Sequence, residues 1–199
     1  MAIDRFTLEF PSMRREADAL EFIREFEDEE SYPCGTNNLH ALLQTSGKIE
    51  TYAEWLESCK NNRTAELSIT GVPTETYFLV RERDERIVGM TTIRLELNDL
   101  CWNNGGNIDY CIRKSERGQG YAKINLFLSL KVCYEHDIEA ILIDCDQNDL
   151  ASKCAIRSLD ARIIRERWND FHHTWNRTFV IDVTESVINH FDEYMRKIY

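Results

Sequence analysis

The sequence predicts a single α/β domain in which a mixed, mostly antiparallel sheet of about seven strands has helices on both faces. Three observations support this fold class. Runs rich in β-branched and aromatic residues alternate with runs whose apolar residues recur at helical spacing, and no linker or repeat interrupts them. The chain has 199 residues, of which 43% are hydrophobic, which is enough for one buried core. A glycine-bearing turn joins one predicted strand to a helix.

Residues 1–70 are predicted to be mainly helical. Apolar residues recur every three or four positions in the segment 17–28, and the acidic residues between them are expected to form its solvated face. A second helix is expected to begin after Thr51, because Thr51 and Glu54 match a capping box. In this motif the threonine oxygen accepts from a helical amide and the glutamate reaches back to the first residue.

Residues 76–183 are predicted to contain the sheet. Its strands are expected at 76–82, 87–95, 108–113, 139–145, 162–168 and 174–183. Helices are expected to begin near Tyr121 and to cover 148–159. A further C-terminal helix is predicted over 184–199, where Val187, Ile188, Phe191, Met195 and Ile198 share one face. That apolar face is expected to pack on the chain's own sheet or, as the second possibility, on another copy, so the protein is expected to be a monomer or a homodimer.

Composition restricts the possible partners and the cellular location. The net charge is −11, so a nucleic acid is not expected as a partner, whereas a cationic ligand would be attracted. We predict a cytoplasmic protein without membrane contact, because no apolar run approaches ~20 residues and residues 1–11 do not resemble a signal peptide. The seven cysteines form no Cys-x-x-Cys pair, so they are predicted to be reduced core residues, and no metal site is assigned.

The segment Arg117-Gly118-Gln119-Gly120-Tyr121-Ala122 is the main candidate for a binding site. A turn rich in glycine lets the backbone approach a ligand closely, and the first amides of the following helix are unpaired donors at the positive end of its dipole. Both properties suit a phosphate group. The spacing of the glycines fits neither a Rossmann turn nor a P-loop, because no third glycine and no Gly-Lys-Ser/Thr follow.

This turn resembles the pyrophosphate loop of the GNAT superfamily of acyl-CoA-dependent N-acyltransferases, because Arg117, Gly120 and Ala122 match its pattern Arg/Gln-x-x-Gly-x-Gly/Ala. The stretch 105–117 is similar to the corresponding strand of a bacterial subfamily of predicted acetyltransferases. The resemblance implies the GNAT fold, with residues 1–70 on the acceptor side, and acetyl-CoA as the acyl donor. It also implies a set of cofactor-binding residues: Ile112, Arg113, Arg117, Gly118, Gln119, Gly120, Tyr121, Ala122, Asn148 and Ser152. The basic side chains of Arg113, Lys114, Arg117 and Lys123 are expected to meet the phosphates.

One departure from the family pattern concerns the catalytic acid. Members of the family often carry a tyrosine on the helix after the fifth strand, which protonates the departing thiolate, and Ala155 stands at that position here. A thiolate leaving group with a thiol pKa of about 8.5 needs little help at neutral pH, so water could protonate it. Tyr110 is predicted to point into the core, and it is not expected to replace the missing tyrosine.

The resemblance favours an N-acetyltransferase in which a primary amine attacks acetyl-CoA directly; the alternative is a non-catalytic acyl-CoA-binding module. Glu96 and Asp109 are the candidate bases, because both lie on strands that border the cleft of the resembled fold, and a partly buried carboxylate can have a raised pKa. For each, an ordinary ion pair is an equally good interpretation. A covalent route through Cys111 or Cys145 is less favoured, because no histidine lies at a spacing suited to activate either thiol.

Overall fold

The computed structural model describes residues 4–27, 33–43, 51–170 and 173–190. The described part contains seven strands, as predicted, but they form two sheets instead of one continuous sheet. The first sheet has the order β1-β2-β3-β4 and the second the order β5-β7-β6, and every pairing within each sheet is antiparallel. The strands are β1 (Phe6–Glu9), β2 (Thr74–Arg81), β3 (Arg86–Arg94), β4 (Ile108–Ile112), β5 (Ala140–Asp146), β6 (Arg162–Asn169) and β7 (Thr174–Asp182).

Five α-helices and three short 3-10 helices complete the elements named in the described residues. They are η1 (Met13–Arg15), α1 (Glu16–Arg24), η2 (Leu39–Leu43), α2 (Tyr52–Asn61), α3 (Asp99–Asn103), η3 (Lys114–Glu116), α4 (Tyr121–Glu135) and α5 (Leu150–Arg157). The predicted capping box of α2 is confirmed, because Glu54 N donates to Thr51 Oγ1 at 3.2 Å and Thr51 N donates to Glu54 Oε2 at 3.1 Å. The predicted helices at 17–28 and 148–159 are shorter in the structure than in the prediction.

A last helical segment covers residues 185–190. Val187 and Ile188 pack against the largest core cluster, which supports the expectation that this apolar face covers the chain's own core. The remaining members of the predicted stripe, Phe191, Met195 and Ile198, lie outside the described residues.

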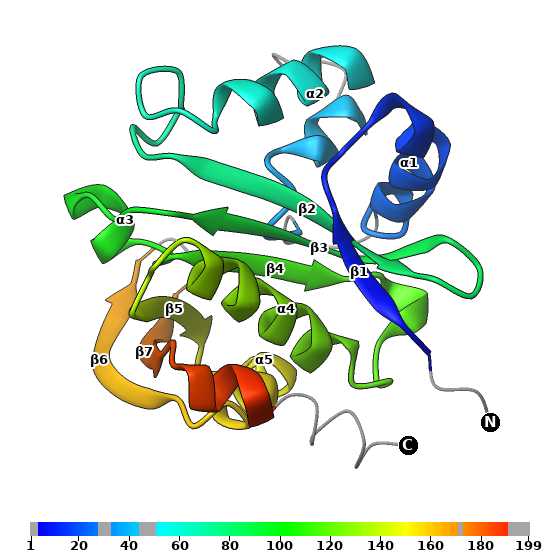
Figure 1. The fold of residues 1–199 in the computed structure, drawn as a ribbon. Helices are drawn as coiled ribbons and strands as arrows, with labels where there is room; N and C mark the ends of the chain where they lie inside the picture. Colours follow the sequence, from blue (N-terminus) through cyan, green and yellow to red (C-terminus); the bar gives the residue numbers. More distant parts are fainter. Residues whose placement is uncertain (1–3, 28–32, 44–50, 171–172, 191–199) are drawn as a thin grey trace.

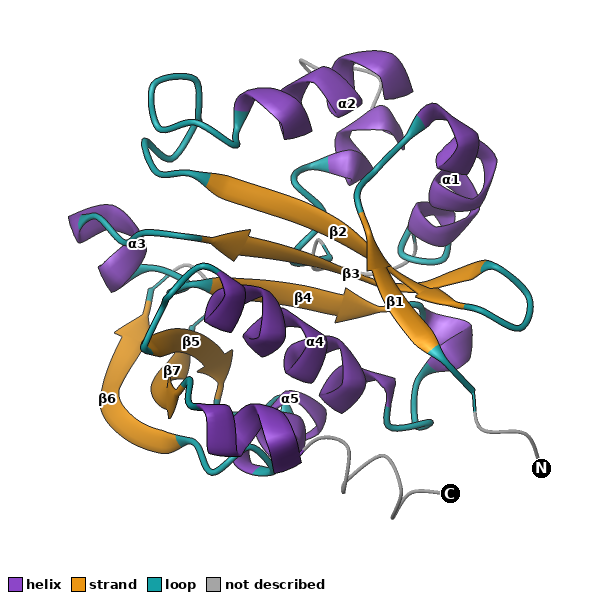
Figure 2. Cartoon of the chain, viewed as in Figure 1, coloured by secondary structure: helices purple, strands orange, loops and turns teal. Residues whose placement is uncertain are grey.

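Helices cover the two faces of the first sheet in separate layers, with α1 and α2 on one face and α4 on the other (Figures 1 and 2). Successive apolar side chains of β2 are shared between these two layers, because neighbouring side chains of a strand point to opposite faces. Phe78 and Val80 pack with α1 and α2, while Tyr77 and Leu79 belong to the clusters on the α4 face. Both faces of the sheet are therefore buried, which explains why β2 and β3 are apolar along most of their length.

Within the described residues, the backbone hydrogen bonds between the two sheets lie where β4 begins. Asn107 N donates to Leu142 O at 2.7 Å, and Leu142 N donates to Asn107 Oδ1 at 2.8 Å. One isolated bridge, between Gly106 and Ile143, adds to this contact. Further along, the described β4 pairs with β3 alone, so the second sheet diverges from it. The divergence leaves room for a cavity between the end of β4 and α5.

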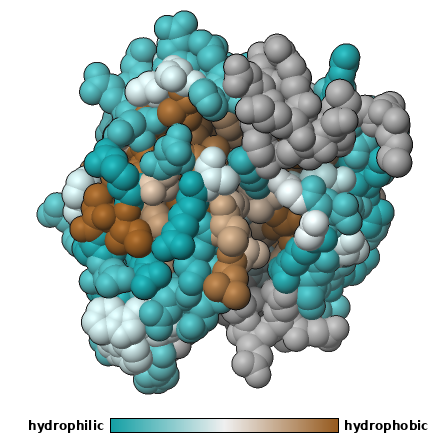
Figure 3. Space-filling view, turned by 90° about the horizontal axis from the view of Figure 1, so that it is seen from below, coloured by the Kyte–Doolittle hydropathy of each residue, from teal (hydrophilic) through white to brown (hydrophobic). Residues whose placement is uncertain are grey.

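Most of the face seen from below is hydrophilic, with exposed apolar side chains gathered in smaller areas (Figure 3). Within the four described ranges of the chain, none of the helices combines the length and the apolar character that a membrane span requires.

Candidate active site

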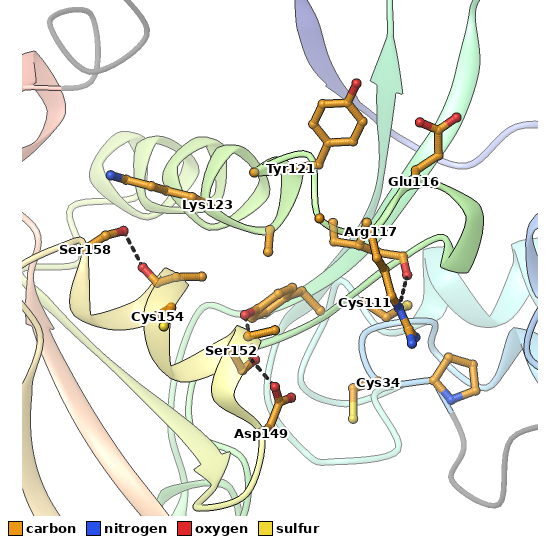
Figure 4. A pocket seen from close by; sticks show the side chains of 18 of the residues that line it. Cys34, Cys111, Glu116, Arg117, Tyr121, Lys123, Asp149, Ser152, Cys154 and Ser158 are labelled. Atoms are coloured by element: carbon orange, nitrogen blue, oxygen red, sulfur yellow. Dashed lines mark hydrogen bonds between the residues drawn. The ribbon is translucent and has the colours of Figure 1, made fainter. Parts of the chain in front are cut away.

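A cavity of about 760 Å³ lies between the end of β4, the turn that follows η3, the first turn of α4, and α5. Residues 33–34, in the segment between α1 and η2, close it on the remaining side. Figure 4 shows that Arg117 and Ser152 lie on facing walls, while Lys123 and Ser158 lie at the α4–α5 end. The cavity therefore has one end at the predicted phosphate turn and another at the acceptor-side segment.

The turn has the backbone geometry that an anion site needs. Gly118 and Gly120 have φ values of +79° and +81°, a region that residues with a side chain rarely adopt. A Cβ built on either glycine would meet nothing within 4 Å, so the space beside the backbone is open. Gly120 is the N-cap of the 15-residue helix α4, whose first amides and positive dipole end face this space. The residues present fit a pyrophosphate group.

Two basic side chains reach the cavity from this turn. Arg117 stacks over Phe26 at 5.5 Å, and its Nε donates to Ile112 O at 3.3 Å. Lys123 comes from the first turn of α4, and desolvation lowers its pKa from the usual value. A lysine that is partly desolvated gains most from an anionic neighbour, which is what a phosphate would supply.

A buried arginine forms ion pairs that fix the residues next to the glycine turn. The side chain of Arg81, at the end of β2, is 5% exposed and binds Glu116 at 2.7 Å and Asp84 at 2.7 Å. Its Nη1 also donates to the Tyr121 hydroxyl at 3.1 Å. Glu116 and Tyr121 stand on either side of the glycine turn, so Arg81 fixes both of its ends. The Tyr121 hydroxyl is thereby held by Arg81.

The Arg113 side chain, which was predicted to meet phosphates, lies outside the cavity lining. Its guanidinium is fully buried and binds Asp18 at 3.0 Å and Glu21 at 3.1 Å on α1. A buried guanidinium that turned toward a phosphate would have to give up the two carboxylates that neutralise it, so Arg113 is poorly placed to bind phosphates. Arg113 therefore attaches α1 to the end of β4, and Arg117 and Lys123 are the basic side chains that face the cavity.

The opposite end of the cavity carries hydroxyl, thiol and carboxylate groups. Tyr110 Oη lies 2.7 Å from Ser152 Oγ, and Ser152 N donates to Asp149 Oδ1 at 2.8 Å. Cys34 stands on the facing wall (Figure 4). Desolvation, together with the negative charges of Asp109 and Asp149, raises the pKa of Cys34 to about 11. Asp109 and Asp149 therefore place negative charge near this end of the cavity, which Arg94 partly offsets, and Cys34 itself is neutral at pH 7.

Close backbone contact fixes the position of Cys34. A Cβ at Gly35 would lie 2.4 Å from Asp109 O and 2.7 Å from Tyr110 Cα, so only glycine permits this approach. Gly35 consequently lets the acceptor-side segment pack directly on β4, beside the residues that line the cavity.

Most, but not all, of the predicted cofactor-binding residues line the cavity. Those that do are Ile112, Arg117, Gly118, Gly120, Tyr121, Ala122 and Ser152. Gln119 is exposed and is not part of the lining. The side chain of Asn148 instead donates to Thr174 Oγ1 at 3.1 Å, which ties the loop before α5 to β7.

Neither predicted base is on the cavity wall. Glu96 is exposed in the bend after β3. Asp109 binds Arg94 at 2.6 Å and influences the cavity through its charge near Cys34. The carboxylate that does line this end is Asp149, the N-cap of α5, which was not among the residues predicted from the sequence. Tyr110 packs against the largest core cluster, as predicted, but its hydroxyl also reaches α5 at the cavity wall.

Among the described residues, no group of three or more His, Cys, Asp or Glu side chains is arranged to hold a metal ion.

A family model for the acetyltransferase (GNAT) domain matches residues 7–162, which is most of the chain. The chain belongs to the GNAT acetyltransferase family. Its membership makes this protein an acyltransferase, and it confirms the family predicted from the turn at 117–122. A comparison with curated protein sequences finds no significant match.

Solved structures with the same fold include three that bear on ligands. The Vibrio fischeri ribosomal-protein-S5-alanine acetyltransferase is 11% identical with a TM-score of 0.61, over 93% of this chain and 96% of that one. Mycobacterium smegmatis RimJ, in complex with CoA-disulfide, is 14% identical with a TM-score of 0.62, over 89% and 81%. The yncA protein of Salmonella typhimurium, with its cofactor acetyl-CoA, is 13% identical with a TM-score of 0.55, over 90% and 95%. These similarities establish the fold of this GNAT acetyltransferase.

Proposed function

We propose that this acyltransferase transfers the acetyl group of acetyl-CoA to a primary amine by direct attack within a ternary complex. The observation that supports it is the cavity itself, because one end is a glycine turn suited to a pyrophosphate and the other carries negative charge. Structures of similar fold contain acetyl-CoA or CoA-disulfide, which is consistent with this donor.

The donor would be held mainly at the turn. The amides around Gly118 and Gly120 would donate to the pyrophosphate, and Arg117 and Lys123 would neutralise its charge. Arg117 Nε donates to Ile112 O in the structure. If the arginine turned toward a bound phosphate, the Ile112 carbonyl would become available to another donor. The strand edge near Ile112 would then be open to an extended ligand, as the family resemblance implies.

Transfer requires no protein nucleophile. The amine nitrogen forms a bond to the acetyl carbon, the carbon–sulfur bond breaks, and the sulfur leaves with the bonding pair. The amine loses one proton and the thiolate gains one, both by way of water or a side chain. A thiol route is disfavoured at neutral pH because desolvation raises the pKa of Cys34 to about 11 and burial raises that of Cys145 to about 12.

We propose a cationic amine as the acceptor, bound at the end of the cavity near Asp149. Both Asp149 and Asp109 place negative charge there, and a positively charged amine would be attracted before it loses its proton. Either carboxylate, directly or through a water molecule, would then take that proton. Asp109 acts through its charge on Cys34, whereas Glu96 is exposed after β3, so Glu96 is the less favoured of the two bases predicted from the sequence.

The test combines turnover with mass spectrometry. Thiol release from acetyl-CoA should depend on an added amine, and a panel of polyamines, aminoglycosides and peptides would identify the class. Incubation with acetyl-CoA alone should leave every cysteine unmodified. A stable acyl-cysteine on Cys111 or Cys145, with activity abolished by serine at that position, would instead establish a covalent route. Tight CoA binding without turnover for any amine would favour a non-catalytic module.

A further inference from the structure

A half-buried phenol on the cavity wall has no role in the function proposed above. Tyr110 lies on β4, and its hydroxyl is 2.7 Å from Ser152 Oγ on α5. Both residues line the cavity, so this pair of hydroxyl groups spans the gap that the diverging sheets leave between β4 and α5. A phenol and an alcohol within hydrogen-bond distance, beside a ligand-sized space, can direct one hydrogen toward a ligand.

The order of residues along β4 fixes where this pair lies relative to the turn. β4 runs from Ile108 to Ile112 and is followed by η3 and the glycine turn. Tyr110 is two residues before the end of the strand, or about 7 Å by the usual rise of a β-strand. A ligand anchored by its pyrophosphate at the turn and extended along β4 would pass Ile112 and run toward Tyr110, which lines the same cavity.

The residues near Tyr110 on the cavity wall are less suited than its hydroxyl to donate a hydrogen bond to a ligand. Ala155 lines the same cavity one turn after Ser152 and carries no polar group. Cys34 on the facing wall is a weak donor. Asp149 is acceptor-only when ionised, so it cannot donate to a developing anion.

We propose that Tyr110, oriented by Ser152, donates a hydrogen bond to the sulfur of the thioester and stabilises the thiolate as it leaves. This inference rests on the proposed acetyl transfer. The 2.7 Å contact fits donation in either direction; in the arrangement proposed here the Ser152 hydroxyl donates to the phenol oxygen, which leaves the single phenol hydrogen to point into the cavity. As the carbon–sulfur bond breaks, the sulfur receives the bonding pair, and the phenol hydrogen offsets the charge that develops there.

The phenol acts as a hydrogen-bond donor and keeps its proton. Burial raises the pKa of Tyr110 far above its usual value, so the group stays protonated throughout the neutral range. Such a weak acid does not surrender a proton to a thiolate whose own thiol has a pKa of about 8.5. The thiolate therefore takes its proton from water after it has left.

The decisive measurement is the ionisation of bound CoA, which requires no turnover. The thiolate absorbs in the ultraviolet, and its titration is obtained as the difference between the CoA and desulfo-CoA complexes. With Tyr110 donating to the thiolate, the thiol pKa of bound CoA should be at least one unit lower in the wild type than in Tyr110→Phe. One unit is a tenfold change in the acid constant, the size expected for a hydrogen bond to a charged group.

Two further variants separate orientation from a general effect of losing a phenol. Ser152→Ala keeps the phenol but loses its orienting partner, so the thiol pKa of bound CoA should rise by a smaller amount. Tyr134→Phe removes an exposed phenol on α4 outside the cavity and should match the wild type. Equal affinities for desulfo-CoA in the variants would confirm that binding itself is intact.

Kinetics of acetyl transfer then separate this inference from the proposed function. Tyr110→Phe should lower kcat by about tenfold or more while the KM for acetyl-CoA changes by less than about threefold. If the wild type transfers acetyl groups but neither kcat nor the thiol pKa responds to Tyr110→Phe, the role of Tyr110 is refuted and the transfer function stands. If no amine is acetylated but the thiol pKa responds as expected, the hydrogen bond is supported and the transfer function fails. If the wild type does not bind CoA, both fail.

Discussion

Leucine in place of Gly120 should abolish most of the affinity for CoA at a modest cost in stability. A residue with a side chain at φ +81° costs about 1–2 kcal/mol relative to glycine, so the free energy of unfolding should fall by about that amount. Because nothing lies within 4 Å of the Cβ position, the leucine side chain would project into the open space proposed for the pyrophosphate. Each charge-assisted hydrogen bond lost there should cost about 1.5–3 kcal/mol, or roughly ten- to a hundredfold in affinity.

Gly71→Leu is the matched control for the backbone effect. Gly71 has φ +70°, is exposed, and lies outside the cavity lining. Both variants should lose similar stability in a denaturant titration, but calorimetry should show weaker CoA binding only for Gly120→Leu. If the affinity of Gly120→Leu stayed within about threefold of wild type, a change of ~0.65 kcal/mol, the turn would not be the pyrophosphate site.

Three other substitutions or measurements test the remaining parts of the site. Asp149→Asn keeps an N-cap side chain, so stability should hold within about 0.5 kcal/mol while kcat/KM for a cationic amine falls tenfold or more; if it does not fall, Asp109→Asn becomes the decisive variant. Alkylation of Cys34 should be slow at pH 7 and rise about tenfold per pH unit toward pH 11, because its raised pKa leaves little thiolate below that value; a plateau near pH 9 would contradict the raised pKa. Arg113→Met should cost about 2–3 kcal/mol of stability, because Asp18 loses its partner but keeps some solvent contact, and should leave CoA affinity unchanged; lost affinity with unchanged stability would restore its predicted phosphate role.

Local patterns predicted the parts of the site that depend on neighbours in sequence. The turn before α4 and the cap of α2 were predicted because glycine, threonine and glutamate act within a few residues. Strands β2 and β3 were predicted because both of their faces are buried. The strand β1 was missed, since four residues with mixed burial carry too little signal.

Contacts between distant segments decided what the sequence could not predict. The alternation along β4 places Tyr110 on one face, but only the divergence of β4 from β5 turns that face into a cavity wall. Arg113 looked like a phosphate ligand because it precedes a glycine turn. Its partners, Asp18 and Glu21, lie more than ninety positions earlier in the chain and could not be inferred from spacing.

The attachment of α1 to the segment just before the glycine turn has a consequence for folding. Glu25 accepts from both the amide and the hydroxyl of Ser115, over a separation of 90 residues, and Arg113 adds contacts to α1 over 92 and 95 residues. The turn cannot acquire these restraints until a very long loop has closed, which makes it a late and slow feature of folding. A chain without its first 25 residues would still contain the glycine turn, but the contacts of Arg113 and Ser115 with α1 would be lost. The N-terminal layer and the glycine turn should therefore exchange their amide hydrogens as one cooperative unit.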